Sequence, residues 1–179
     1  MPKAKDILLS TLTGKGWSIE KNSTNICNLP ESVQKRYHIP QEMLSAKGSV
    51  SRENVLAEYI EFLADTWACV NPDETVWMLC MEDFSQEIEH AFSWNEFEML
   101  SLQAAVDAKD EEWQKDIKAF WDNHLPICLS VRDGYSYYAI RIEDGHVVCG
   151  SSPEFEETTD IADSFYRFAE MVSGGEIDL

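Results

Sequence analysis

Basic residues are scarce in this sequence. Its 179 residues include 14 Lys and Arg against 33 Asp and Glu, which gives a formal net charge of -19. A field of that sign repels phosphate backbones and anionic headgroups, so we expect neither nucleic acid nor a membrane as a partner. The same field would attract a basic protein and would act mainly on its association rate. An acidic surface that serves solubility alone is the alternative.

Long apolar runs are also missing. No stretch approaches the roughly 20 apolar residues that cross a bilayer, and residues 1–16 lack the pattern of a secretory signal. The cysteines are odd in number and lie mostly in apolar stretches, as reduced, buried cysteines do. We therefore expect a cytoplasmic protein. The cysteines are Cys27, Cys69, Cys80, Cys128 and Cys149.

The common motifs of enzymes and metal sites are absent as well. The sequence contains no CxxC, HExxH, P-loop, GxGxxG or GxSxG pattern. His146 and Cys149 come close to ligand spacing, but on a strand they would point to opposite faces. Acid pairs such as Glu154 and Glu156 could serve a glycosidase, yet with so many acids such pairs arise by chance. We expect no catalytic residues, no metal ligands and no cofactor.

What is present suffices for a packed core, because 44% of the residues are hydrophobic and 11% are aromatic. The length fits a single domain. Residues 1–50 are polar and interrupted by Gly and Pro, which predicts a loosely organised N-terminal segment. Residues 51–172 are expected to form the α+β domain, and residues 173–179 a frayed tail.

Apolar residues at helical spacing predict several helices. Leu56, Ile60, Leu63 and Trp67 indicate a helix that Ser51 would cap. A capping box at residues 93–96 indicates the start of another, and a last helix is expected from about residue 160. The inner faces of the two helices after the capping box are predicted to carry Phe97, Leu100, Ala104, Trp113, Ile117, Phe120 and Trp121.

Strand patterns fill the remaining sequence. Residues 75–81 suit a central strand, and residues 126–131, 135–142 and 146–149 alternate like an antiparallel meander with turns between them. On the middle strand of the meander both faces carry apolar side chains, so helices should cover at least one of them. The prediction is an α+β fold with a central, mostly antiparallel sheet and flanking helices.

The segment 151–157 (SSPEFEE) is the strongest candidate for a binding site. Pro153 cannot pair within a central strand, so the segment is expected to be a loop or sheet edge. Its carboxylates could hold a basic partner while Phe155 anchors in a pocket. The alternative is a solvated loop whose Phe155 lies under the final helix. The predicted partner-binding residues are Asp133, Tyr135, Tyr137, Glu154, Phe155, Glu156 and Glu157.

The stretch from Leu125 to Val172 resembles the SUKH superfamily, which contains fungal cell-wall-assembly regulators and many bacterial immunity proteins. The resemblance is carried, in order, by DGYSYYAI, EDGHVV, G-x-x-P-E-F-E-E and ADSFYRF. Upstream, YIEFL and TVWMLCMEDF are similar to an earlier helix and strand of that family. The resemblance implies an α+β domain with a central antiparallel sheet. Many members are thought to neutralise toxins, especially nucleases and deaminases, and they share no catalytic motif.

The expectation is therefore a non-catalytic immunity protein that binds a basic toxin of nuclease or deaminase type. A regulatory scaffold that binds a host enzyme or a cell-envelope synthesis complex is the alternative. A hydrolase is a third possibility, and it would require two carboxylates in a pocket, at least one with a perturbed pKa. The sequence leaves the oligomeric state open.

Overall fold

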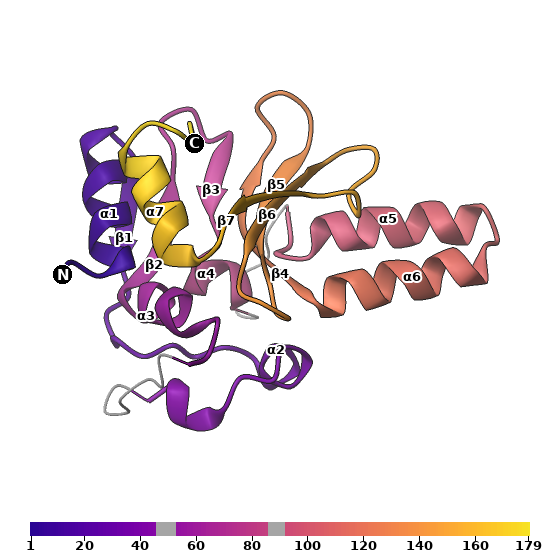
Figure 1. Cartoon of the computed structure of the whole chain (residues 1–179), viewed down its shortest axis with the longest axis horizontal. Helices are drawn as coiled ribbons and strands as arrows, with labels where there is room; N and C mark the ends of the chain where they lie inside the picture. Colours follow the sequence, from indigo (N-terminus) through magenta and orange to yellow (C-terminus); the bar gives the residue numbers. More distant parts are fainter. Residues whose placement is uncertain (46–52, 86–91) are drawn as a thin grey trace.

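The computed structural model describes residues 1–45, 53–85 and 92–179. In these residues seven strands form one sheet in the order β1-β2-β3-β4-β5-β6-β7, and each strand is antiparallel to its neighbours. The predicted α+β class with a mostly antiparallel sheet is confirmed (Figure 1). The strands are Ser18–Lys21 (β1), Thr66–Val70 (β2), Val76–Met78 (β3), His124–Ser130 (β4), Ser136–Arg141 (β5), Val147–Ser151 (β6) and Thr159–Ala162 (β7).

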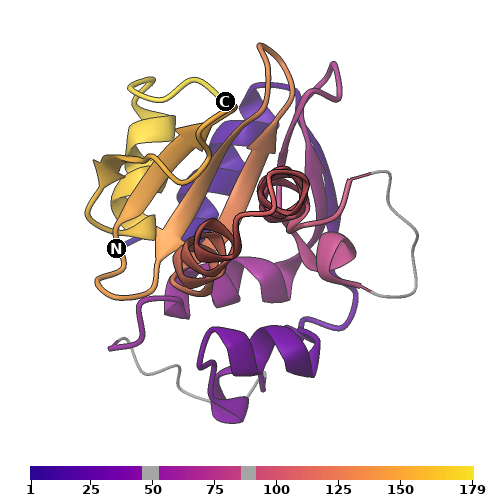
Figure 2. The same cartoon turned by 90° about the vertical axis from the view of Figure 1, so that its right-hand side faces the viewer.

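Helices cover both faces of this sheet, as Figure 2 shows. On β5 the ring of Tyr138 contacts Phe168 of α7, while the ring of Tyr137 points the other way and contacts Trp121 of α6. The alternation of the strand therefore supplies side chains to the packing on both faces of the sheet. The helices are Ala4–Gly14 (α1), Glu31–Arg36 (α2), Ala57–Asp65 (α3), Met81–Phe84 (α4), Glu96–Asp107 (α5), Glu111–Asp122 (α6) and Phe165–Ser173 (α7), with a 3-10 turn at Gln41–Met43 (η1).

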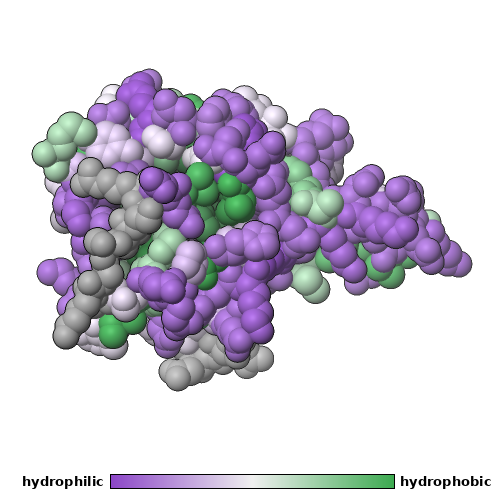
Figure 3. All heavy atoms as spheres, turned by 60° about the horizontal axis from the view of Figure 1, so that its bottom comes forward, coloured by the Kyte–Doolittle hydropathy of each residue, from purple (hydrophilic) through white to green (hydrophobic). Residues whose placement is uncertain are grey.

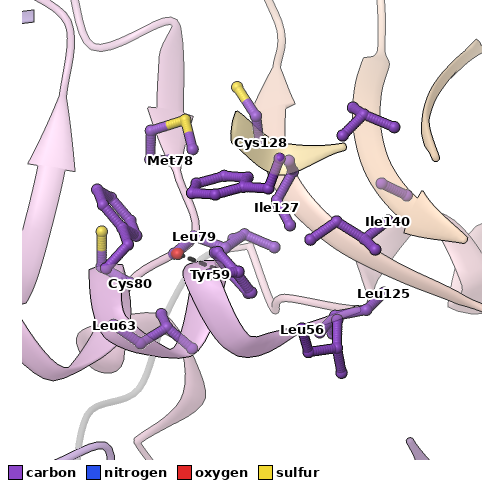
Figure 4. Packing of buried hydrophobic residues seen from close by; sticks show 14 of the residues in the cluster. Leu56, Tyr59, Leu63, Met78, Leu79, Cys80, Leu125, Ile127, Cys128 and Ile140 are labelled. Carbon is purple, nitrogen blue, oxygen red and sulfur yellow. Dashed lines mark hydrogen bonds between the residues drawn. The ribbon is translucent and has the colours of Figure 1, made fainter. Parts of the chain in front are cut away.

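One side of the hydrophobic core lies between the sheet and the layer of α1, α3 and α7. Tyr59 of α3 is fully buried there, and its hydroxyl donates a hydrogen bond to the Leu79 carbonyl at 2.7 Å (Figure 4). Burial raises the pKa of this phenol well above its usual value, so the hydroxyl stays protonated. Side chains from α3, β3, β4 and β5 surround it, including Leu56, Leu63, Met78, Ile127 and Ile140.

The N-terminal segment differs from the loosely organised one that the sequence suggested. Ala4, Leu8 and Leu12 recur every fourth residue on α1 and are all buried, and α1 contacts both α3 and α7. Strand β1 then adds an edge to the sheet by pairing with β2. The inner face of α1 is narrow, so its periodicity is weak among polar residues. The C-terminal tail also differs from expectation, because Ile177 and Leu179 are buried.

Two predicted helices have different limits in the structure. The first ends at Asp65, and Trp67 lies in β2, at the irregularity where the pairing with β1 shifts between Ala68 and Thr66. The predicted cap, Ser51, lies outside the described residues. The last helix begins only at Phe165, because Ser164 caps it by accepting a hydrogen bond from the Arg167 amide at 3.1 Å. Residues 159–162 instead form β7 against β6.

Helices α5 and α6 form a hairpin that projects from the sheet (Figures 1 and 2), and residues 96–122 are called the arm below. Glu96 accepts from the Ser93 amide at 3.1 Å, which is one half of the predicted capping box. The Ser93 hydroxyl donates to the same carboxylate, so the other half is not formed as predicted. On α5 the buried apolar residues are Phe97 and Ala105, whereas the predicted Leu100 is exposed.

Candidate protein-binding surface

Two loops at the same end of the sheet bring the predicted site residues together. The β4–β5 loop (residues 131–135) and the β6–β7 loop (residues 152–158) touch where the Ser152 amide donates to the Tyr135 carbonyl at 2.8 Å. This hydrogen bond continues the pairing of β5 with β6 beyond the ends of both strands. All of the predicted contact residues lie on these two loops or on β5 beside them.

A stack of three rings joins the loops to the arm. Phe97, at the start of α5, lies between Phe155 and Tyr135 and is nearly parallel to both, with ring centroids 4.7 Å and 5.5 Å apart. Trp121, in the last turn of α6, contacts Tyr137 from the same side of the sheet. The two ends of the hairpin thus meet the sheet through aromatic contacts, which add to the free energy gained by burial.

Two of the predicted contact residues are buried and cannot touch a partner in this structure. Phe155 is 5% exposed and Tyr137 is 1% exposed. The Tyr137 hydroxyl donates to the Phe155 carbonyl, and burial raises the pKa of this phenol. The alternative interpretation placed Phe155 under the final helix, and this is wrong as well. It lies against α5, because the loop folds back over the face of the sheet that carries the arm.

Glu156 has a structural partner as well. Its carboxylate accepts a hydrogen bond from the indole Nε1 of Trp121 at 2.8 Å, and its side chain is half-buried. A buried indole N–H needs an acceptor, and Glu156 supplies it. This carboxylate therefore fixes the last turn of α6 to the β6–β7 loop.

The remaining predicted residues are exposed and form one surface, called the loop surface below: Asp133, Tyr135, Glu154 and Glu157. Tyr135 is 39% exposed, and its inner side stacks on Phe97. The ring is therefore held in place while its outer side faces solvent, which lowers the entropy cost of using it as a contact. Carboxylates beside an ordered tyrosine suit a basic protein surface.

Gly150 explains one position of the G-x-x-P-E-F-E-E pattern. A Cβ atom at this residue would lie 2.6 Å from the Tyr137 hydroxyl oxygen and 2.8 Å from the Phe155 carbonyl oxygen. Both distances are shorter than non-bonded atoms tolerate, so only glycine fits here. The pattern thus encodes the close approach of the β6–β7 loop to β5.

The base of the arm is held by residues that sequence reasoning missed. Arg36 of α2 makes two hydrogen bonds to the buried carboxylate of Glu98, at 2.9 Å and 2.7 Å, and a third to Asp122 at 2.9 Å. Burial by itself would lower the pKa of Arg36, but the hydrogen bonds with Glu98 raise it, so the charge is retained. The Tyr37 hydroxyl donates to the Trp121 carbonyl at 3.1 Å. No sequence pattern pairs α2 with the arm.

A separate ion-pair cluster lies at the β5–β6 turn. Arg141 bonds to Asp144 at 2.7 Å and to Asp160 at 2.8 Å, and His146 also contacts Asp160, at 3.1 Å. The hydrogen bonds from Arg141 and His146 lower the pKa of Asp160 to about 2. The pKa values of Asp73 and Asp144 are lowered as well. A carboxyl group that acts as a general acid requires the opposite, a raised pKa. Within residues 1–45, 53–85 and 92–179, no three His, Cys, Asp or Glu side chains are grouped to hold a metal ion.

Two hollows of the surface lie away from these loops. One of about 1120 Å³ opens between residues 20–34 and α4, and it is lined largely by polar side chains. A second, of about 460 Å³, lies near the start of α7 and includes Asp144 and Asp163. None of the predicted contact residues lines either hollow.

Comparison of the chain with protein-family models, with curated proteins and with solved structures gave no match. Among the described residues, no helix combines the length and the hydrophobicity that a membrane crossing requires.

Proposed function

We propose that this chain is a non-catalytic protein-binding domain that neutralises a basic toxin of the nuclease or deaminase type. One observation carries the proposal: Tyr135, held from behind by Phe97, is exposed on a loop surface that also presents carboxylates. The two loops that form this surface overlap two of the four motifs that carry the resemblance to the SUKH superfamily, DGYSYYAI and G-x-x-P-E-F-E-E.

Electrostatics supports this choice of partner. An enzyme that acts on nucleic acid presents Lys and Arg around its active site to hold phosphates. Carboxylates of the loop surface can occupy those positions, and a net charge of -19 adds long-range attraction. The tyrosine ring then supplies the apolar contact that slows dissociation. The toxin is inhibited because its active site is covered, and no bond is made or broken.

The test uses the protein encoded beside this chain, expressed together with it and separately. We expect a stable complex and the loss of the toxin's activity. In surface plasmon resonance, the variant Glu154→Lys/Glu157→Lys should associate about tenfold or more slowly and with a weaker salt dependence. The variant Tyr135→Ala should mainly raise the dissociation rate, by about tenfold or more.

A control with the same net charge separates the loop surface from the overall field. Glu31→Lys/Glu42→Lys changes two exposed glutamates near α2, on the far side of the molecule from these loops (Figure 1). Each Glu→Lys change adds two charges, so both double variants carry -15 instead of -19. Equal effects of the two variants would refute a specific loop surface. A stable partner captured from cells that lack the toxin would instead favour the regulatory scaffold.

A further inference from the structure

The arm carries large hydrophobic side chains that the rest of the chain leaves uncovered. Met99 and Val106 of α5 are 53% and 50% exposed, Leu100 is 39% exposed, and Trp113 of α6 is 40% exposed. Elsewhere in the described residues, few large hydrophobic side chains are so open to solvent. Figure 3 shows hydrophobic atoms along one side of the otherwise hydrophilic arm. Isolated exposed side chains are ordinary, but a group on one projecting element indicates an interaction site.

Helical geometry places two of these residues on one ridge. Met99 and Val106 are seven residues apart, which is close to two turns, so their side chains lie on the same face of α5. The buried residues Phe97, Ser101 and Ala105 define the opposite face, which is turned toward α6 and the sheet. Met99 and Val106 are called the α5 ridge below.

The exposed face of α6 is more polar than that of α5. Between the start of α6 and the buried Ile117, Trp113 is the one exposed hydrophobic residue, and the other exposed positions, Glu111, Glu112, Lys115 and Asp116, are charged. Helix α5 should look the same if its outer face served only solubility. An apolar ridge with the seven-residue spacing of paired helices instead suits a helix that packs along it.

The negative charge of the arm favours a basic protein over a second copy of this chain as the molecule that covers the α5 ridge. Its acidic residues outnumber its three lysines, and of these acids Glu98 and Asp122 are already paired with Arg36. A second copy of this chain would bring two bodies of charge -19 together through two acidic arms, which repulsion disfavours. The acidic residues of the arm are Glu96, Glu98, Asp107, Asp110, Glu111, Glu112, Asp116 and Asp122.

We propose that the α5 ridge docks a basic amphipathic helix of the partner protein, an inference that rests on the proposed function and assigns it a second contact site. The apolar face of the incoming helix covers Met99 and Val106, and its Lys and Arg side chains lie over the acidic residues of the arm. Side chains of residues 103–116 make their hydrogen bonds and ion pairs within the arm, as far as the structure describes them, so docking there breaks none with the body.

The test uses two synthetic helical peptides of equal length and charge as probes. One has Leu at the helical spacing i, i+3, i+4 and i+7 with Lys at the positions between, and the other has Ser in place of each Leu. By fluorescence anisotropy, the Lys/Leu peptide should bind the full chain one to one, and Met99→Gln/Val106→Gln should weaken that binding about tenfold. The Lys/Ser peptide should bind far more weakly. Equal binding of the two peptides would show attraction by charge alone and would overturn the proposal.

Ile26→Gln is the control for Met99→Gln/Val106→Gln, because Ile26 is 44% exposed, nearly as open as the residues of the ridge, but lies outside the arm. The control should leave peptide binding unchanged, and an equal loss in both variants would also overturn the proposal. Sedimentation velocity tests the second copy as occupant: a dimer that Met99→Gln/Val106→Gln abolishes would refute docking of a partner helix. Circular dichroism should confirm that each exposed substitution leaves the fold intact.

The two proposals fail in different ways. If the toxin binds and neither its affinity nor its dissociation rate changes in Met99→Gln/Val106→Gln, the α5 ridge is refuted while the proposed function stands. If the Lys/Leu peptide binds the ridge but no basic toxin is inhibited, the proposed function is refuted while the ridge stands.

Discussion

Phe97 and Phe155 lie face to face, with ring centroids 4.7 Å apart and ring planes 9° from parallel. The first ring belongs to the arm and the second to the β6–β7 loop, so this contact fixes the arm relative to the loop surface. Tyr135 stacks on the other side of Phe97 and completes the link. The position of the exposed tyrosine therefore depends on a buried phenylalanine that a partner would never touch.

Phe155→Ala should lower the free energy of unfolding by about 3 kcal/mol, because it removes a buried ring and leaves a cavity against Phe97. Glu154→Ala, at the exposed neighbouring position, should change it by less than about 0.5 kcal/mol. Urea denaturation followed by tryptophan fluorescence measures both. Similar stabilities of the two variants would contradict the burial of Phe155.

Gly150→Ala should destabilise the fold by about 2 kcal/mol, because its Cβ would overlap the Tyr137 hydroxyl and the Phe155 carbonyl. Gly14→Ala is the natural comparison. No atom lies within 4 Å of a Cβ there, and alanine suits the end of α1 better than glycine, so its stability should stay the same or rise. Thermal unfolding that ranks the two variants the other way would refute the close approach at Gly150.

Arg36→Met should cost about 3 kcal/mol, because it leaves the buried Glu98 carboxylate without its partner. Lys35→Met removes the adjacent Lys35–Glu31 pair, which is exposed at both ends, and should cost less than about 0.5 kcal/mol. The double variant Arg36→Met/Glu98→Met should recover part of the loss, because no buried charge then remains unpaired. A double-mutant cycle by urea denaturation measures the coupling, and additive losses would argue against the buried pair.

Acidification should destabilise the protein partly through His124. This ring stacks on Phe120, and its Nδ1 donates to the Phe120 carbonyl at 2.7 Å. Burial lowers the pKa of His124 below the usual 6.5, so the folded chain binds its proton less readily than the unfolded chain does. The stabilising effect is therefore complete above about pH 6.5 and is lost as the pH falls below that value.

The measurement compares the free energy of unfolding at pH 7.5 and pH 5.5 for the natural chain and for His124→Gln. The natural chain should lose more stability between the two values, because glutamine does not titrate there. The other histidines are present in both proteins and cancel in the difference. Parallel pH profiles would show that His124 has an unshifted pKa.

The sequence contained much of the information about the sheet. Alternating residues in segments 126–131 and 135–142, with turns between them, predicted the meander that β4, β5 and β6 form. The helical spacing around Leu63 predicted α3 but extended the helix too far, because Trp67 continues the helical period although it lies in β2, which pairs with β1. Only the neighbouring strands decide between the two.

The predicted contact residues lie close together in the structure, but not all of them are exposed. Loop 151–157 and the start of β5 do come together, and Tyr135 and Glu154 are exposed. Phe155 and Tyr137 are buried because α5 and α6 stand on that face of the sheet, a contact between segments far apart in the sequence. A surplus of apolar residues on α5, more than one helix face needs, was the available signal for the exposed ridge at Met99 and Val106.

The sequence by itself determined the α+β class, the antiparallel meander and the strongly negative charge, because periodicity and composition are properties of the local chain. Only the tertiary structure decided which aromatic side chains face solvent. Periodicity shows that Phe97 and Leu100 could share a helix face with their neighbours, but the sheet and α6 cover one and leave the other open. Burial is a property of the surroundings that long-range packing supplies.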